Sequence, residues 1–329
     1  MRRLAAFGTA LALLGTVAGC ASRHQRSATA SAPATTTATA TATATTTTPS
    51  SAAACAGTAG ASTSHTMNVA SHPRTFIEHL PSNFAASTKY VAIIVFPGRG
   101  ESAAQIEGYS QLDSTNTIVL YAQGLDGTDG ESTWEATPYA GASAHDYEFA
   151  ADMVNWLAGA PCVDANRIGL TGKSDGAGFA ASAACVTSGV AAVATVSGAF
   201  YQADTRCTPT GRPLPVMNMH GAEDPVIPYN GSTTRGLYST NAWLALWQQR
   251  DSCTGSSTNT PVGADVVRST LTSCTDGTEV VNYDIADGGH TWPGATVTSG
   301  PGGTTHTIDA AQLIAAFFTD SQSLSARLH

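Results

Sequence analysis

The chain has 329 residues, a formal net charge of −9 and only 12% charged residues. This acidic, sparsely charged composition argues against nucleic acid as a partner, because nucleic acid is bound through basic surfaces. Low charge combined with many threonine, serine and glycine residues is typical of an extracellular domain that meets neutral polymers.

Residues 1–19 have the features of an export signal. Two arginines near the start precede an apolar run at 4–17, which is too short to span a bilayer comfortably. The run ends in Val-Ala-Gly-Cys, which is similar to the bacterial lipobox, where the cysteine is lipidated and becomes the new N-terminus. We expect a lipoprotein signal peptide with a lipid on Cys20, and an ordinary signal peptide cut nearby is the alternative. Either predicts an exported protein, secreted or held at the cell envelope, that meets a membrane only through an N-terminal lipid anchor.

Residues 20–54 are predicted to form a disordered tether. From residue 27 onwards this segment is almost entirely threonine, alanine, serine and proline, so no apolar burial can offset the entropy of ordering it. From residue 55 to 329 the composition is globular. A stretch of about 275 residues can bury one large core, which predicts a single domain.

Apolar runs and amphipathic segments alternate along this domain. Runs typical of strands occur at 75–80, 91–96, 117–121, 168–171, 191–196, 215–220 and 280–285, and helical segments at 146–157, 177–184, 240–250 and 308–319. Buried strands that alternate with helices predict an α/β fold with a mostly parallel sheet and helices on both faces. In such a fold, ligands bind at the carboxyl ends of the strands.

One strand of this series runs into a G-x-S-x-G motif centred on Ser174. The strand, the motif at 172–176 and the following helix match the nucleophile elbow of α/β-hydrolases, although a chance match in a glycine-rich chain is the alternative. The turn is sharp enough to strain the backbone of Ser174 and to lift its hydroxyl clear of the sheet. Glycine fits at 172 and 176 because a side chain there would collide with neighbouring elements.

An acid and a base follow Ser174 in the order that α/β-hydrolases require. A serine hydroxyl needs a base to take its proton, and the base needs an acid to fix its tautomer. Asp224 follows the strand at 215–220, with Glu223 as the competing acid, and His290 lies in a glycine-rich loop after the strand at 280–285. The order Ser, Asp, His predicts a catalytic triad. His220, which precedes Asp224, is expected to be structural.

Two backbone N–H groups are expected to form an oxyanion hole near Ser174. One belongs to Asp175, the residue after the serine. The other is expected from the loop at 97–100, which follows the strand at 91–96. Pro97 has no N–H, so Arg99 is the first candidate and Gly98 the second.

Six cysteines remain when Cys20 is set aside. An even number in an exported chain predicts three disulfides, and the absence of a C-x-x-C motif or a Cys/His cluster argues against a metal site. The count alone allows 15 connectivities. The six residues are Cys55, Cys162, Cys185, Cys207, Cys253 and Cys274.

Together these motifs resemble the exported feruloyl esterases, within a group that also holds acetylxylan esterases and polyhydroxyalkanoate depolymerases. The resemblance covers nearly all of residues 55–318 and is carried by the segments at 96–100, 121–124, 171–179, 196–201, 220–224, 249–253 and 289–294. Two positions depart from the family pattern. Pro97 replaces the usual histidine, and Asp175 replaces the usual asparagine, which places a carboxylate beside the expected oxyanion.

The resemblance implies a serine ester hydrolase that releases ferulic acid from plant cell-wall polysaccharide and needs no cofactor or metal. A polyhydroxybutyrate depolymerase and an acetylxylan esterase are the enzymatic alternatives, and a polysaccharide-binding surface lipoprotein is the non-enzymatic one. Trp292 and Trp134 are the expected aromatic contacts for the substrate, a polysaccharide or polyester. Packing is an equal alternative for Trp134, and Trp292 could serve both purposes. Together with sequence proximity, the resemblance favours the disulfides Cys55–Cys162, Cys185–Cys207 and Cys253–Cys274.

Overall fold

The computed structural model describes residues 54–320, which lie within one compact unit, Thr48–His329. The expected signal peptide at 1–19, the lipidation site Cys20 and all but the last residue of the expected tether lie outside the described residues. Within the described range, no helix has the length and apolar character needed to cross a membrane.

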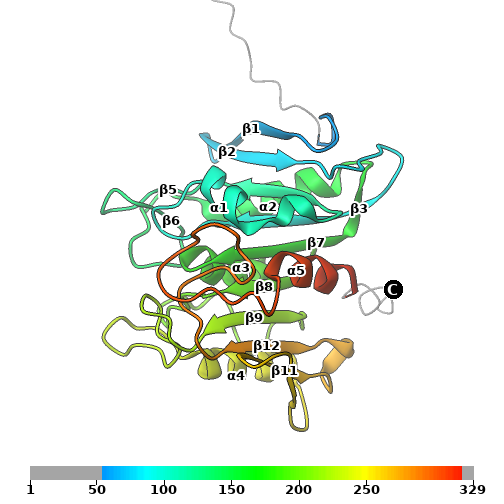
Figure 1. The fold of residues 1–329 in the computed structure, drawn as a ribbon. Coiled ribbons are helices and arrows are strands. Elements are labelled where there is room, and N and C mark those ends of the chain that lie inside the picture. The colour runs from blue at the N-terminus through cyan, green and yellow to red at the C-terminus, as the bar shows by residue number, and fades with distance from the viewer. Residues whose placement is uncertain (1–53, 321–329) are drawn as a thin grey trace, which may run out of the picture. The chain divides into compact units, whose positions relative to one another are not determined.

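A ten-stranded sheet forms the centre of the described domain (Figure 1). Its spatial order is β1-β2-β4-β3-β7-β8-β9-β12-β11-β10, and the six central strands from β4 to β12 run parallel. The strands span Ser62–Val69 (β1), His72–His79 (β2), Tyr90–Phe96 (β3), Ile118–Ala122 (β4), Val163–Lys173 (β7), Val190–Val196 (β8), Val216–Gly221 (β9), Thr258–Pro261 (β10), Val266–Leu271 (β11) and Val280–Ile285 (β12). A separate pair joins β5 (Leu125–Asp126) to β6 (Ser132–Thr133).

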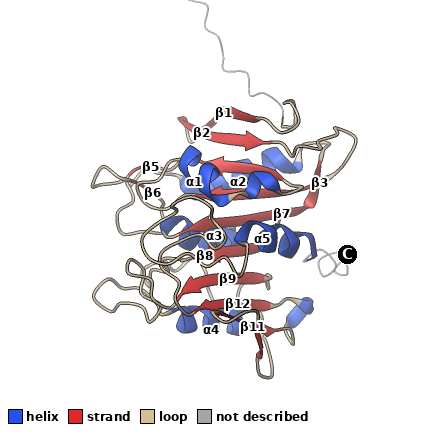
Figure 2. Ribbon diagram, in the orientation of Figure 1, coloured by secondary structure: helices blue, strands red, loops and turns tan. Residues whose placement is uncertain are grey.

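Helices cover both faces of this sheet, as Figure 2 shows. The helices α2 (Asp146–Ala158), α3 (Asp175–Val186) and α4 (Thr240–Arg250) pack on one face, and α1 (Ala103–Ser110) and α5 (Ala310–Asp320) pack on the other. Two short 3-10 turns lie at Leu112–Ser114 and Thr275–Gly277. Successive residues of β3 alternate between the two cores, which is why its sequence is apolar throughout.

The sequence prediction of a mostly parallel α/β sheet covered on both faces is therefore confirmed. The predicted helix at 240–250 and the predicted strand at 280–285 have the bounds of α4 and β12. The missed elements are mainly the edge strands β1 and β10, the strand β11 beside β10, and the short helix α1. These three strands contain many exposed polar residues, so they lack the apolar run that marks a central strand.

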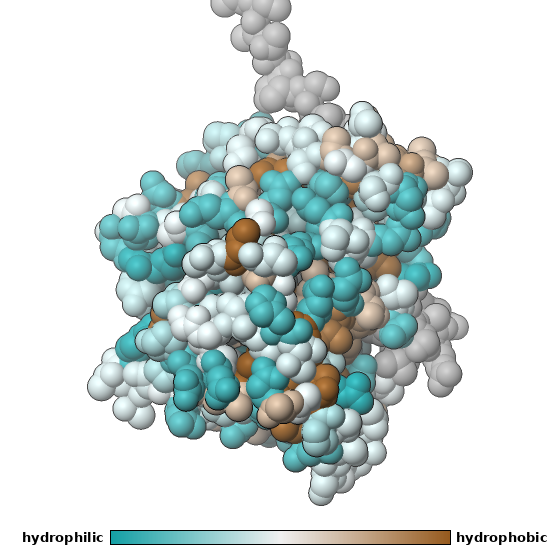
Figure 3. Space-filling model, viewed as in Figure 1, coloured by the Kyte–Doolittle hydropathy of each residue, from teal (hydrophilic) through white to brown (hydrophobic). Residues whose placement is uncertain are grey.

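The described surface is mostly polar. Figure 3 shows hydrophilic residues and residues of intermediate hydropathy over most of the viewed face, with small hydrophobic spots among them. Among the described residues, large apolar side chains are more than a third exposed at only five positions, which are spread from residue 125 to residue 297. They are Leu125, Val186, Val262, Val267 and Val297.

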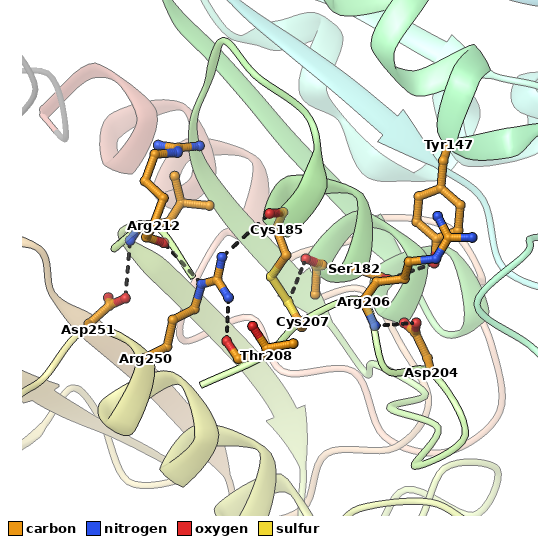
Figure 4. Close-up of a disulfide and its surroundings, with 12 residues drawn as sticks. Tyr147, Ser182, Cys185, Asp204, Arg206, Cys207, Thr208, Arg212, Arg250 and Asp251 are labelled. Carbon is orange, nitrogen blue, oxygen red and sulfur yellow. Dashed lines mark hydrogen bonds between the residues drawn. A yellow bond between two sulfur atoms is a disulfide. The ribbon is translucent and has the colours of Figure 1, made fainter. Parts of the chain in front are cut away.

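Three disulfides fasten the domain, in the pairs that the resemblance implies. They join Cys55 to Cys162, Cys185 to Cys207 and Cys253 to Cys274. Figure 4 shows the second of these, which links the end of α3 to the segment after β8. Arg250 of α4 donates hydrogen bonds to main-chain carbonyls of this same segment, at Thr208 and at Arg212 (3.0 Å for the latter). Disulfides of this number are typical of an exported protein.

A buried ion pair attaches the N-terminal hairpin to α2. The guanidinium of Arg74 in β2 lies 2.7 Å from the carboxylate of Asp146 at the start of α2, and both side chains are almost fully buried. Arg74 also donates to the carbonyl of Ala144 (2.8 Å) and packs 4.2 Å from the ring centre of Phe149. Burial raises the pKa of Asp146, and the charge of Arg74 opposes that rise.

We expect the variant Arg74→Met to lose about 3–5 kcal/mol of unfolding free energy, because it leaves Asp146 buried without a counter-charge. Urea unfolding at neutral pH measures this. The double variant with Asp146→Leu should recover part of the loss, because no uncompensated charge remains. A loss below about 1 kcal/mol for Arg74→Met would show that the pair does not hold the hairpin.

Candidate active site

Ser174 occupies a strained turn between β7 and α3. Its φ of 57° and ψ of −125° place it outside the regions that non-glycine residues favour. A Cβ atom on Gly172 would lie 2.6 Å from the carbonyl oxygen of Phe96, and one on Gly176 would lie 2.1 Å from that same atom. Both positions therefore require glycine, and the close approach of β3 fixes the turn.

Main-chain hydrogen bonds hold this turn from the neighbouring strand β8. The N–H of Ser174 donates to the carbonyl of Val196 (3.0 Å), and its own carbonyl accepts from the N–H of Ala199 (3.0 Å). The carbonyl oxygen of Ala199 would lie only 2.1 Å from a Cβ on Gly178, so α3 passes close to the segment after β8. Contacts on both sides thus offset the backbone strain at Ser174.

Asp224 and His290 meet beyond the ends of two adjacent strands. Asp224 follows β9 and His290 follows β12; in Figure 1 these strands point to the left, where the loops after them lie. His290 Nδ1 lies 2.8 Å from Asp224 Oδ2, and both side chains are buried. Asp224 Oδ1 accepts from the N–H groups of Val226 and Ile227, each at 2.8 Å. An ionised carboxylate only accepts hydrogen bonds, and both oxygens of Asp224 face donors. These surroundings therefore suit a charged Asp224.

The pKa of Asp224 is lowered by this setting. Burial alone would raise it, but the hydrogen bond and the charge of His290, with the two main-chain donors, outweigh the burial. An ionised Asp224 accepts from Nδ1 and leaves Nε2 of the neutral imidazole without a proton, which is the tautomer that a general base requires.

Glu223 and His220, the other acid and histidine near Asp224, are not placed to act in the triad. Glu223 is exposed, whereas Asp224 is buried against His290, so the structure favours Asp224 over its competitor. His220 is 1% exposed, and its Nε2 donates to the carbonyl of Ile227 (2.9 Å). Burial lowers the pKa of His220, which keeps it neutral beneath Asp224.

Ser174 and His290 line one cleft of about 260 Å³, while Asp224 lies behind His290. The structure therefore brings the three predicted residues to one end of the sheet. The cleft is lined by Gly98, Arg99, Glu101, Tyr139, Lys173, Ser174, Asp175, Tyr201, Val226, Ile227, Arg235, His290, Gly300 and Pro301.

Glu101 organises the loop expected to supply the second oxyanion donor. Its Oε2 accepts from the N–H of Gly98 (2.9 Å) and from the hydroxyl of Tyr109 (2.8 Å). Its Oε1 lies 2.9 Å from Nζ of Lys173, the residue before Ser174. The N–H of Gly98 is thus already used, and Arg99 remains the candidate donor. Lys173 and Glu101 join this loop to the elbow through a partly buried ion pair, in which the side chain of Lys173 is 3% exposed and that of Glu101 is 21% exposed.

Asp175 begins α3, so the helix itself offers no acceptor for its N–H group. Its side chain is 3% exposed and takes weak hydrogen bonds from the hydroxyls of Thr133 and Tyr201, each at 3.4 Å. Burial raises the pKa of Asp175, while these hydrogen bonds and the charges of Arg99 and His290 oppose the rise. The carboxylate is thus hydrogen-bonded to the hydroxyls of Thr133 and Tyr201.

The expectation that Trp134 and Trp292 contact the substrate is wrong. Trp134 is 1% exposed, donates its indole N–H to the carbonyl of Pro97 (2.8 Å) and stacks on Phe179 at 5.1 Å. Trp292 is fully buried in the core that α1 and α5 cover, and neither indole lines the cleft. Burying a large indole in a core is more favourable in free energy than leaving it exposed in a loop.

Two tyrosines supply the aromatic surface of the cleft instead. Tyr139 and Tyr201 line it with ring centres 6.5 Å apart in an edge-to-face arrangement. Sequence reasoning missed both of them, and Glu101 as well. Tyr201 lies in the segment 196–201, which carries the resemblance, so the sequence offers some indication of its place in the site. No sequence pattern indicates Tyr139, because only the fold brings its loop to the cleft.

Comparisons with known proteins find hydrolases and esterases. A family model described as BAAT / Acyl-CoA thioester hydrolase C terminal matches residues 145–249. The protein named "Putative esterase NocK" from Nocardia uniformis subsp. tsuyamanensis is 27% identical over 264 residues, which cover 71% of this chain and 75% of that protein. Feruloyl esterase B from Piromyces equi is 28% identical over 233 residues, 66% of this chain but only 42% of that longer protein.

Solved structures share the fold. The acetyl xylan esterase from Aspergillus awamori superposes with a TM-score of 0.53 at 14% identity, over 78% of this chain and 99% of that one. Esterase 2 of Thermogutta terrifontis, phosphoramylated by tabun, gives 0.50 at 12% identity, over 80% and 96%. The chain has the α/β-hydrolase fold, and the relatives that it resembles in sequence are named as esterases. The resemblance inferred from its motifs is confirmed at that level, and carboxylic ester hydrolysis is the reaction class that the relatives support.

If the Lys173–Glu101 pair positions the loop, Glu101→Gln should lower kcat on an aryl acetate about tenfold or more and leave KM nearly unchanged. Gln keeps an acceptor for Gly98 but loses the charge that Lys173 needs, and Glu101→Leu should be worse because it loses both. Steady-state kinetics measures this, with thermal unfolding to verify the fold. Unchanged kcat in a folded Glu101→Gln variant would show that the ion pair has no part in positioning.

Proposed function

We propose that this esterase hydrolyses carboxylic esters with Ser174 as nucleophile, His290 as general base and Asp224 as the acid that orients His290. The observation that carries the proposal is the 2.8 Å contact between His290 and Asp224 beside a cleft that His290 shares with the strained Ser174. A binding protein has no need for a serine held in this conformation, so the geometry favours an enzyme over a polysaccharide-binding lipoprotein.

The reaction would follow from the hydrogen bonds. Nδ1 of His290 donates to Asp224, so Nε2 accepts the hydroxyl proton as Ser174 Oγ attacks the ester carbonyl. The N–H groups of Arg99 and Asp175 stabilise the oxyanion. Collapse of the tetrahedral intermediate breaks the bond to the alcohol, which leaves with the proton from His290. Water then adds to the acyl-serine by the same path and releases the acid.

For the substrate, we propose feruloyl esters on plant cell-wall xylan. The resemblance to exported feruloyl esterases supports this, and so does the 28% identity to feruloyl esterase B of Piromyces equi. The walls formed by Tyr139 and Tyr201 could hold a flat aromatic acid beside Ser174. An acetylxylan esterase or a polyhydroxybutyrate depolymerase would use the same triad, and substrate tests decide between them.

The lipobox-like sequence leads us to propose that a lipid on Cys20 tethers the enzyme to the cell envelope, with residues 20–54 as the spacer. The three disulfides fit an exported domain. Metabolic labelling with a fatty-acid analogue should mark the wild-type protein and leave Cys20→Ser unmarked. Equal labelling of both would exclude this anchor.

The triad is tested by substitution. We expect Ser174→Ala and His290→Ala each to lower kcat by about 10⁶, and the double variant to be little worse, because the residues act as a unit. Asp224→Asn should also cripple turnover, since it disturbs the tautomer of His290, whereas Glu223→Gln should be close to wild type. A Ser174→Ala variant that kept a tenth of the wild-type rate would remove Ser174 from this role.

The aromatic wall is tested with two substrates. We expect Tyr139→Ala to lower kcat/KM on methyl ferulate about three- to tenfold more than on an aryl acetate, because only the ferulate offers a ring to stack on. Tyr139→Phe keeps the ring and should preserve the ratio. If the wild-type enzyme ignored methyl ferulate but cleared polyhydroxybutyrate or acetylated xylan, the feruloyl assignment would fall.

A further inference from the structure

The catalytic cleft contains a guanidinium that has no carboxylate partner. We propose that Arg235 makes this cleft prefer, among the esters it hydrolyses, those whose acyl or alcohol part also carries a carboxylate. This inference rests on the proposed esterase function of the Ser174 cleft and adds a substrate class to it. Arg235 lines the same cleft as Ser174 and His290, and its side chain is exposed.

Arg235 differs from the other cations of the cleft lining because those cations have carboxylate partners. Lys173 is paired with Glu101 at 2.9 Å, and Arg99 is paired with Asp129 outside the cleft. The carboxylate of Asp175 is buried and interacts with the charge of Arg99. Among the described residues, no carboxylate lies within ion-pairing distance of Arg235. A protein with a net charge of −9 therefore presents a solvent-facing cation beside its candidate nucleophile.

The loop that carries Arg235 is well braced. Nη1 of Arg235 donates to the carbonyl of Val226 (2.6 Å), which lies two residues after Asp224. The main chains of Ser232 and Leu237 pair with each other on either side of Arg235, and the N–H of Tyr238 donates to the carbonyl of Phe200 (2.9 Å). The guanidinium also hydrogen-bonds the hydroxyl of Tyr201, so it is held at one edge of the cleft with its remaining donors available.

A guanidinium held in this way matches a carboxylate in shape and charge. It offers paired N–H donors in a plane, which bind the two oxygens of a carboxylate together. Tyr201 lies beside Arg235, and the charge of Arg235 acts on its hydroxyl. Asp175 and Glu101 are the acidic groups of the cleft lining that would repel an anion. Glu101 is paired with Lys173 (2.9 Å), and the charge of Arg99 acts on Asp175, which is buried.

Two matched substrate pairs test the inference. The first pair is 4-acetoxybenzoate against its methyl ester, which differ by one carboxylate on the alcohol side. The second is mono-4-nitrophenyl adipate against 4-nitrophenyl methyl adipate, which differ on the acyl side. For each pair, the ratio of kcat/KM values is compared between wild type and variant, so that intrinsic reactivity cancels. Arg206→Gln is the control, because Arg206 is also exposed but lies outside the cleft lining, against Tyr147.

We expect Arg235→Gln to reduce the preference for the anionic member about fivefold in at least one pair, a modest change because an exposed ion pair is weak. Arg235→Lys should keep part of the preference, Arg206→Gln should keep all of it, and added salt should reduce it. Equal ratios in wild type and Arg235→Gln for both pairs would overturn the inference, as would an equal change in Arg206→Gln.

Binding to an inactive enzyme separates this inference from the proposed function. Equilibrium titration of Ser174→Ala with 4-acetoxybenzoate and its methyl ester should show the same preference for the anion, lost when Arg235→Gln is added. If no ester is turned over but this preference exists, the esterase proposal fails and the anion site stands. If esters are turned over but neither binding nor kinetics depends on Arg235, the anion site fails and the esterase stands.

Discussion

The crossing of α3 over the end of β3 is the constraint on which the site depends. Gly172 and Gly176 lie so close to the carbonyl of Phe96 that no side chain fits at either position. This closeness goes with a positive φ at Ser174, and Ser174 lines the cleft. The buried strands on both sides, β3 and β8, supply the packing that stabilises the strained turn.

Two polar networks meet at this turn from opposite sides. On one side Asp224, fixed by two main-chain donors, holds His290 by Nδ1. On the other side Glu101 holds Lys173 and the loop of Gly98. The first network is buried and the second is partly buried. A charge left without a partner is costly in such surroundings, so each network favours one arrangement of its members. This rigidity is what a preorganised catalytic site needs.

The sequence predicted what depends on local pattern and chain order. Central strands are uniformly apolar, the elbow has its glycines at fixed spacing, and Asp224 and His290 follow Ser174 in order, so these features could be found without a structure. Positions set by long-range packing could not be found in this way. Trp292 lies two residues from His290 in sequence, yet its indole is buried in the core, whereas Tyr139, distant in sequence, lines the cleft. Glu101 was missed because its partner Lys173 lies 72 residues away.

Covalent labelling tests the central claim that this fold activates Ser174. A fluorophosphonate should add to the native enzyme in a 1:1 ratio, and peptide mapping should find the adduct on Ser174. Labelling should be lost in His290→Ala although the serine is still present, because the hydroxyl then lacks its base. An adduct on another serine, or undiminished labelling of Ser174 without His290, would contradict the account.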